Sequence, residues 1–287
     1  MIAILKREFK SYLHNVSGFI FIAFLLLFVG VFTAAYNLFG GLASFEYSLS
    51  NVVTVFLLIV PILTMRSIAE DKHNRTDRLL YSLPIRMSSV VIAKYLAMVC
   101  VFLISLAVMC VYPVILSAFG IVNYLSAYST VFGLFMLGCA LIAICMFLSS
   151  LTESQVIAAV ISFGVLLALY LMSALSSMIP TTALASFLCF TLLAILLALL
   201  VYALTKNFNV TVIVAAVCVI PLCILYLANA SLFSGLFPKL LSYLAVFDRF
   251  YTFIYGIFDV TAIVYYLTFI VFFLFLTVQV MEKKRWS

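Results

Sequence analysis

Long intervals without charge constrain the fold of this chain more than any other feature of its sequence. A helix of about 20 apolar residues spans the hydrocarbon core of a bilayer, whereas a transmembrane strand alternates over about 10 residues. Only 8% of the residues are charged and 68% are hydrophobic, whereas soluble domains carry about 25% charged residues. We therefore expect an all-α, polytopic membrane helical bundle. Five intervals contain no Asp, Glu, Lys or Arg: residues 11–45, 95–152, 154–205, 207–238 and 260–281.

Eight apolar segments are long enough to be membrane spans. The second is the least regular, because it contains Pro61, and a proline bends a helix. Neighbouring helices in a bundle can satisfy the carbonyl that the proline frees. No boundary between domains is apparent, so residues 1–287 are expected to form a single transmembrane domain. The candidate spans are residues 17–39, 47–66, 92–119, 124–150, 155–178, 182–204, 210–232 and 262–281.

The basic residues are distributed unequally between the two sides of such a bundle. With eight spans, 13 of the 15 Lys and Arg residues fall on one side, and only Lys239 and Arg249 fall on the other. Cytoplasmic loops carry the excess of basic residues in membrane proteins. Both termini are therefore expected in the cytoplasm, in a multi-pass protein of the cell membrane. Nucleic-acid binding is not indicated, because the basic residues form no single face.

The segment 231–259 is apolar but interrupted by charges, which are costly at the centre of a bilayer. We expect it at the outer surface, or as a re-entrant pair of short helices. Its aromatic residues are typical of the belt at a membrane interface. The alternative is an outer gate, formed by Phe247, Asp248, Arg249 and Phe250.

Several kinds of chemistry have no support in the sequence. No glycine precedes a lysine, so the chain has no Walker A loop for ATP. The spans are expected to bury no acidic or basic residue, which argues against a proton relay. Glu70, Asp71 and Arg75 resemble the EExxxR motif of CAAX-type intramembrane metalloproteases, but those enzymes need later histidines, and only His14 and His73 occur here. We expect no catalytic residue, no metal and no cofactor in this chain.

The richest polar segment is the loop of residues 66–91. Asn74 is a candidate N-cap, and Pro84 disfavours continuation of a helix, so the pattern predicts a short helix over Arg75–Leu83. Such a helix can lie on anionic lipid headgroups, or it can fit a groove on a soluble partner. Its apolar face would consist of Thr76, Leu79, Leu80 and Leu83.

Two other segments are amphipathic or polar. A helix over residues 1–14 would have an apolar stripe on one face, with Lys6, Arg7 and Lys10 pointing away from it. This pattern is typical of an interfacial helix or of a simple positive anchor. In the loop 149–155, Thr152 and Gln155 have capping-box spacing. Glu153 is the only charge between Lys94 and Lys206, so a partner contact there is a hypothesis.

Taken together, these segments resemble ABC-2 type transporter permeases, in particular the gliding-motility-associated subfamily. The resemblance covers about residues 1–180 and 240–287, around a family core of six spans, so the segments 182–204 and 210–232 look like extra helices. It is carried by residues 66–71, Thr76, Leu79, Leu80, residues 82–84 and Lys94, by the loop 149–155, and by residues 247–250, Gly256, Asp259 and residues 284–286.

The resemblance implies a permease subunit of an ABC transporter that pairs with a cytoplasmic ABC ATPase and with a second permease domain in the membrane lipid of a bacterial plasma membrane. ATP and Mg²⁺ would be bound by the ATPase. The uncharged spans suit a hydrophobic or amphipathic cargo such as a lipid or peptide. A passive channel or scaffold subunit is the alternative. The residues that would couple to the ATPase are Glu70, Asp71, Thr76, Leu79, Leu80, Leu83 and Pro84, with Glu153 as a second contact.

Overall fold

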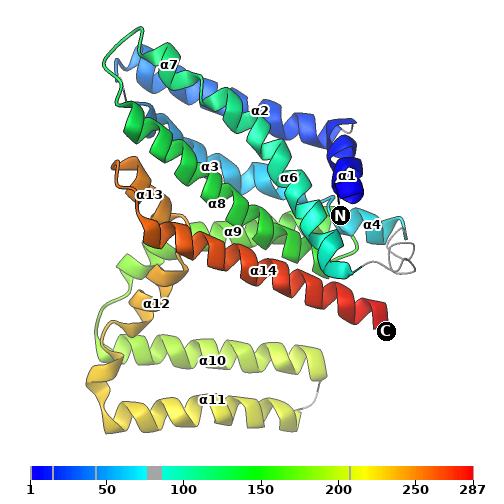
Figure 1. Cartoon of the computed structure of the whole chain (residues 1–287). Helices are drawn as coiled ribbons and strands as arrows, with labels where there is room; N and C mark the ends of the chain where they lie inside the picture. Colours follow the sequence, from blue (N-terminus) through cyan, green and yellow to red (C-terminus); the bar gives the residue numbers. More distant parts are fainter. Residues whose placement is uncertain (1, 15, 43, 76–85, 207, 287) are drawn as a thin grey trace. The chain divides into compact units, whose positions relative to one another are not determined.

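The structure, a computed structural model, describes residues 2–14, 16–42, 44–75, 86–206 and 208–286 (Figure 1). Throughout these residues, every regular element is a helix, which confirms the predicted polytopic helical bundle. Six helices of the described part are long and apolar enough to cross a membrane, or seven if a bent helix pair is one span. The six are Val16–Phe39, Phe45–His73, Met87–Leu116, Tyr124–Leu151, Gln155–Met178 and Val260–Lys284.

The chain divides into two compact units, each of which is described by itself. Unit 1 comprises Met1–Ala168 and Val246–Ser287, and unit 2 comprises Leu169–Ala245. That the whole chain is one transmembrane domain stays a prediction. The described elements of unit 1 are α1 (Ile2–His14), α2 (Val16–Phe32), η1 (Thr33–Phe39), α3 (Phe45–Thr64), α4 (Ala69–His73), α6 (Met87–Met109), α7 (Tyr112–Leu116), α8 (Tyr124–Leu151), α13 (Asp248–Ile254), α14 (Val260–Trp286) and the first part of α9 (Gln155–Met178).

Helix α8 is the centre of unit 1 and packs against α3, α6, α13 and α14. Its small residues let the neighbours approach closely. A Cβ atom at Gly138 would lie 2.3 Å from the ring of Phe102 on α6, and one at Gly133 would lie 2.7 Å from the ring of Phe253 on α13. In a bundle where hydrophobic exclusion from water does not drive helix association, such close packing holds the helices together.

The turn from α2 into α3 is built around one buried amide. Asn37 lies in the π-helical turn η1 and is 6% exposed. Its Nδ2 donates to the carbonyls of Leu42 (2.6 Å) and Ser44 (2.9 Å), and its Oδ1 accepts from Ser48 Oγ (2.6 Å). These bonds satisfy backbone carbonyls that the turn leaves without helical partners. Helix α3 then continues through Pro61 to Thr64.

Unit 2 is a pair of antiparallel helices followed by two shorter ones. α10 (Ala183–Thr205) packs against α11 (Phe208–Ala228), and η2 (Ala230–Phe233) and α12 (Leu236–Leu244) contact α10. Rings at the η2 end pack together, with Phe187 stacked on Tyr226 at 4.5 Å and Phe190 edge-on to Phe237 at 5.1 Å. The chain bends by 116° between Val214–Leu227 and Ala230–Leu244, so a full complement of eight spans stays a prediction.

Candidate functional site

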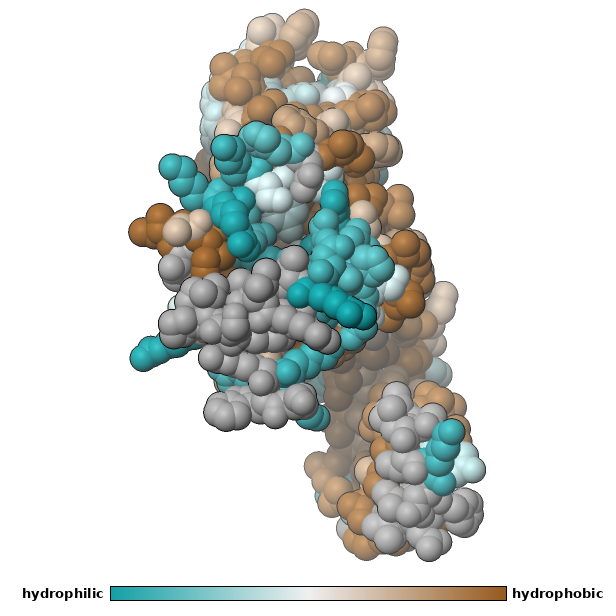
Figure 2. Space-filling model, turned by 90° about the vertical axis from the view of Figure 1, so that its right-hand side faces the viewer, coloured by the Kyte–Doolittle hydropathy of each residue, from teal (hydrophilic) through white to brown (hydrophobic). Residues whose placement is uncertain are grey.

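Polar side chains of unit 1 gather where α3 passes into α4. This end of the unit also carries α1, the start of α6 and the end of α8. Figure 2 looks at the side of the molecule where α1 and α4 lie and shows hydrophilic side chains gathered there, bordered by hydrophobic ones. Many of the charged side chains of unit 1 are therefore concentrated at this end, while the middle of the spans is apolar.

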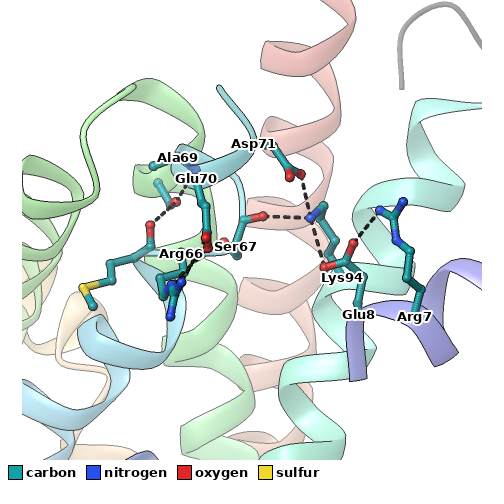
Figure 3. Close-up of polar contacts among 10 residues, drawn as sticks. Arg7, Glu8, Arg66, Ser67, Ala69, Glu70, Asp71 and Lys94 are labelled. Carbon is teal, nitrogen blue, oxygen red and sulfur yellow. Dashed lines mark hydrogen bonds and ion pairs between the residues drawn. The ribbon is translucent and has the colours of Figure 1, made fainter. Parts of the chain in front are cut away.

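Lys94 is the centre of this polar cluster and comes from the second turn of α6. Its side chain is 3% exposed. The Nζ atom lies 2.8 Å from Asp71 Oδ2 and 3.2 Å from Glu8 Oε2, and it donates to the carbonyl of Ser67 at 2.9 Å (Figure 3). The prediction that the spans bury no charge is therefore wrong at this position. The charge is tolerated because two carboxylates and a carbonyl replace its water.

A second ion pair stands beside the first. Arg66 Nε donates to Glu70 Oε2 at 3.0 Å, and Arg66 Nη2 donates to Glu70 Oε1 at 2.9 Å (Figure 3). Both side chains are about one-quarter exposed. The parallel bonds fix both planar groups, so they hold the first turn of α4 against the end of α3.

The end of α8 closes the cluster from the opposite side. Ser149 Oγ accepts from the backbone N–H of Ala69 at 3.2 Å and donates to the Met65 carbonyl at 3.4 Å. Lys72 Nζ donates to the carbonyl of Ser150. The short helix α4 is therefore joined to α8 as well as to α6.

Helix α1 confirms the predicted N-terminal amphipathic helix. Lys6, Arg7 and Lys10 are exposed, whereas Tyr12 is buried, and α1 packs on α6 and α2. Burial raises the pKa of Tyr12, and Glu8 raises it further, so this phenol stays neutral. Glu8 links α1 to α6. One of its carboxylate oxygens lies 2.8 Å from Arg7 on α1, and the other faces Lys94 on α6.

A pocket of about 330 Å³ opens between α1 and α4. It is lined by both charge signs in equal number, because three basic and three acidic side chains face it, so no single charged ligand is favoured. Its lining residues are Arg7, Glu8, Ser11, Tyr12, Ser17, Arg66, Glu70, Asp71, Asn74 and Lys94.

The residues predicted to contact an ATPase fall into two groups. Glu70 and Asp71 lie in α4 and take part in the ion pairs above. Thr76, Leu79, Leu80, Leu83 and Pro84 lie outside the described residues, so their predicted role stays a prediction.

The predicted helix start at Asn74 and Arg75 is wrong. Asn74 closes α4 as its C-cap, with its N–H bonded to the carbonyl of Glu70 at 2.9 Å. Arg75 has φ = +57°, in the left-handed region. A left-handed residue is typical of the end of a helix rather than of its first turn. The ion pairs of Glu70 and Asp71 lie in α4, which ends before the predicted start.

The second predicted contact, Glu153, lies between α8 and α9. Its Oε1 atom is 3.7 Å from Lys284 Nζ, and its side chain is 76% exposed. The predicted capping box is absent, because α9 begins at Gln155 and Thr152 Oγ1 has no hydrogen-bond partner among the described residues. Thr152 instead closes α8 as its C-cap.

The four residues predicted as an outer gate begin helix α13. Phe247 and Phe250 are buried at 2% and 0% exposure. Asp248 and Arg249 are half-buried, and the Arg249 guanidinium lies 5.6 Å from the centre of the Tyr265 ring. The two phenylalanines therefore belong to the core of unit 1 rather than to an aromatic belt, while a gating role stays a prediction.

The site also contains residues that the predictions assigned no role. Glu8, Ser149 and Ser150 supply contacts to α6 or α4. An acidic residue on a basic helix and a lysine close to an apolar run are the two signals that could have paired Glu8 with Lys94. Within the described residues, no three His, Cys, Asp or Glu side chains are placed to hold a metal ion.

Comparison with known proteins gives one match. A family described as "ABC-2 family transporter protein" matches residues 3–208, which is more than two-thirds of the chain. The match includes α10, which the resemblance left out, and ends before residues 240–287, which the resemblance included. No curated protein and no solved structure matches the chain.

Proposed function

The chain belongs to the ABC-2 family of transporter proteins, a family of membrane transport components that are generally not catalytic, and on this premise we propose that it is the permease subunit of an ABC transporter. In this proposal a separate cytoplasmic ATPase binds ATP and Mg²⁺ and hydrolyses the ATP. The chain would work together with a second permease domain in the membrane, as a homodimer or heterodimer.

The observation that carries this proposal is the connection of α4 to three other helices. Asp71 is bonded to Lys94 on α6, Lys94 to Glu8 on α1, and Lys72 to Ser150 on α8. The segment 76–85, which was predicted to meet the ATPase, follows α4 after only two residues. A push on that segment would therefore reach α1, α6 and α8 together, and packed helices respond to such a push by switching between discrete arrangements.

In this mechanism, closure of the ATPase dimer on ATP moves the segment 76–85 and with it α4. The polar cluster passes the movement to the spans, which change the side of the membrane to which the cargo has access. A hydrophobic or amphipathic cargo, such as a lipid or a peptide, fits spans whose described charges lie near their ends rather than at mid-membrane. We place this end, and both termini, in the cytoplasm of a bacterial cell.

The deciding experiment replaces Leu79 and Leu80 with Asp and measures recovery of the ATPase on purified permease. Two carboxylates in an apolar groove are costly unless they are paired, whereas membrane insertion does not depend on these residues. We expect the variant to insert but to lose both the ATPase and transport. Recovery of the ATPase at the wild-type level would refute the coupling role and would favour a segment that only lies on lipid headgroups.

A matched control tests whether added negative charge weakens ATPase binding at any position or only at positions 79 and 80. Lys10→Asp also adds negative charge at an exposed site on α1, and it should keep the ATPase. A passive channel or scaffold subunit, the second candidate, predicts transport or assembly without any dependence on ATP.

A further inference from the structure

A second pocket of unit 1 lies at the other end of α3 from the polar cluster. It has a volume of about 360 Å³, and the 20 residues of α3 separate the two ends by about 30 Å, at 1.5 Å per residue. The first turn of α3, the start of α8 and the end of α13 supply its walls, and Figure 1 shows these three elements at the same end of the unit.

Glu46 is the charged residue of this pocket, and it forms no ion pair with any side chain that the structure describes. The residue is 5% exposed, and its Oε2 atom is shielded from solvent with no hydrogen-bond partner among the described residues. Its place in the first turn of α3 offers partial compensation, because the positive end of a helix dipole favours an anion. A buried carboxylate oxygen without a donor is nevertheless costly, and Glu46 lines the pocket, so a cation bound in the pocket would offset part of this cost.

The other lining residues define what this partner is. They are hydroxyl, amide and aromatic groups, chiefly Ser50, Asn123, Ser126, Tyr47 and Tyr255, and no basic side chain is among those that line the pocket. One carboxylate balances one positive charge, and aromatic faces attract organic cations. A divalent metal ion would need several hard ligands, whereas Glu46 is the one carboxylate among the described residues that line the pocket.

We propose that this pocket binds a single organic ammonium group, with Glu46 as its counter-ion and the tyrosines as its aromatic walls. The site itself does not depend on an ATPase. That the ammonium group belongs to the transported cargo, as the polar head of an amphipathic molecule, rests on the proposed function.

The test is isothermal titration calorimetry of the purified full-length chain with hexylammonium chloride at neutral pH, where the amine is charged like a lysine. Hexanol serves as the neutral probe of the same length. We expect hexylammonium to bind the wild type more tightly than hexanol does. Glu46→Gln, which keeps the shape of the side chain, should weaken hexylammonium binding about tenfold or more, since bonds to charged groups contribute about 1.5–3 kcal/mol.

Two further variants keep the test decisive. Glu282→Gln removes an exposed carboxylate on α14 and should leave the affinity unchanged. The double variant Tyr47→Leu, Tyr255→Leu keeps the charge of Glu46 but removes the aromatic walls, so it should weaken binding. Because both tyrosines are exposed, this variant should fold, and it tests the site even if Glu46→Gln folds poorly. Equal affinity of hexylammonium for wild type and Glu46→Gln, or equal affinity of hexanol and hexylammonium for the wild type, would overturn the proposal.

Two additional arms identify the source of the ammonium group. Dihexanoylphosphatidylethanolamine that binds in a Glu46-dependent manner indicates a lipid headgroup, and Glu46-dependent binding of hexylammonium alone indicates a small amine or a basic side chain. Recovery of the ATPase on Glu46→Gln is measured in parallel. Loss of amine binding with retained ATPase tests this site alone, so its failure is distinguishable from failure of the proposed function.

Discussion

Lys94 Nζ and Asp71 Oδ2 lie 2.8 Å apart, although Asp71 precedes the segment 76–85 and Lys94 follows it. This bond joins α4 to the second turn of α6, on either side of that segment in the sequence. Because the Lys94 side chain is 3% exposed, little water is available to replace a lost carboxylate there. The described helices before and after the segment are therefore held to each other by this ion pair.

Removing the charge of Lys94 should destabilise unit 1. In Lys94→Met the carboxylates of Glu8 and Asp71 lose their shared cation, and breaking a buried pair costs about 3–5 kcal/mol. Thermal unfolding in detergent should show a lower midpoint. Lys10→Met, which removes an exposed lysine from α1, should unfold like the wild type. An unchanged midpoint for Lys94→Met would mean that the cluster contributes little to stability.

Glu70→Gln should have a smaller effect on stability. Arg66 and Glu70 are each about one-quarter exposed, so their bidentate pair should contribute more than the about 0–1 kcal/mol of a fully exposed pair but less than the about 3–5 kcal/mol of a buried one. The unfolding midpoint should therefore stay within a few degrees of the wild type, so that any loss of ATPase binding reports the contact itself. A loss of stability as large as that of Lys94→Met would contradict this ranking of the two ion pairs.

Two glycines on neighbouring helices should respond in opposite ways to alanine. At Gly133 the added methyl group would meet the Phe253 ring at 2.7 Å, and overpacking costs about 1–3 kcal/mol. At Gly164 no atom lies within 4 Å, so alanine should be neutral or should add up to about 1 kcal/mol of helix propensity. Denaturant or thermal unfolding of both variants measures the difference. Equal effects would show that α13 is not packed on α8 as described.

The topology is testable with cysteines introduced on a background in which the seven native cysteines are replaced. The 13-to-2 distribution of basic residues predicts that a cysteine at position 287 is protected from an impermeant reagent in intact cells. A cysteine at position 243, in the segment predicted to be external, should be labelled. Labelling at position 287 in intact cells would reverse the orientation.

The sequence by itself determined the class of this protein. Charge-free intervals of more than 20 residues indicate membrane helices, because backbone groups in lipid must be paired and a helix of about 20 residues pairs them within the segment. For the same reason the helices α3, α8, α9 and α14 lie close to their predicted ranges, whereas the predicted span 92–119 begins at Met87 and is divided between α6 and α7. The amphipathic pattern of residues 2–14 likewise predicted α1, since its period is a local property.

Only the tertiary structure decided how the charges are used. Glu70 and Asp71 were recognised as part of a polar loop. Arg66 is a local partner of Glu70, four residues before it, whereas Lys94 meets Asp71 only because the start of α6 lies beside α4. Glu46 was assigned no role, because nothing in its neighbours along the chain reveals that α8 and α13 enclose it. Periodicity reports which residues share a face of one helix. Which charge meets which, or meets none, depends on contacts between helices far apart in the sequence.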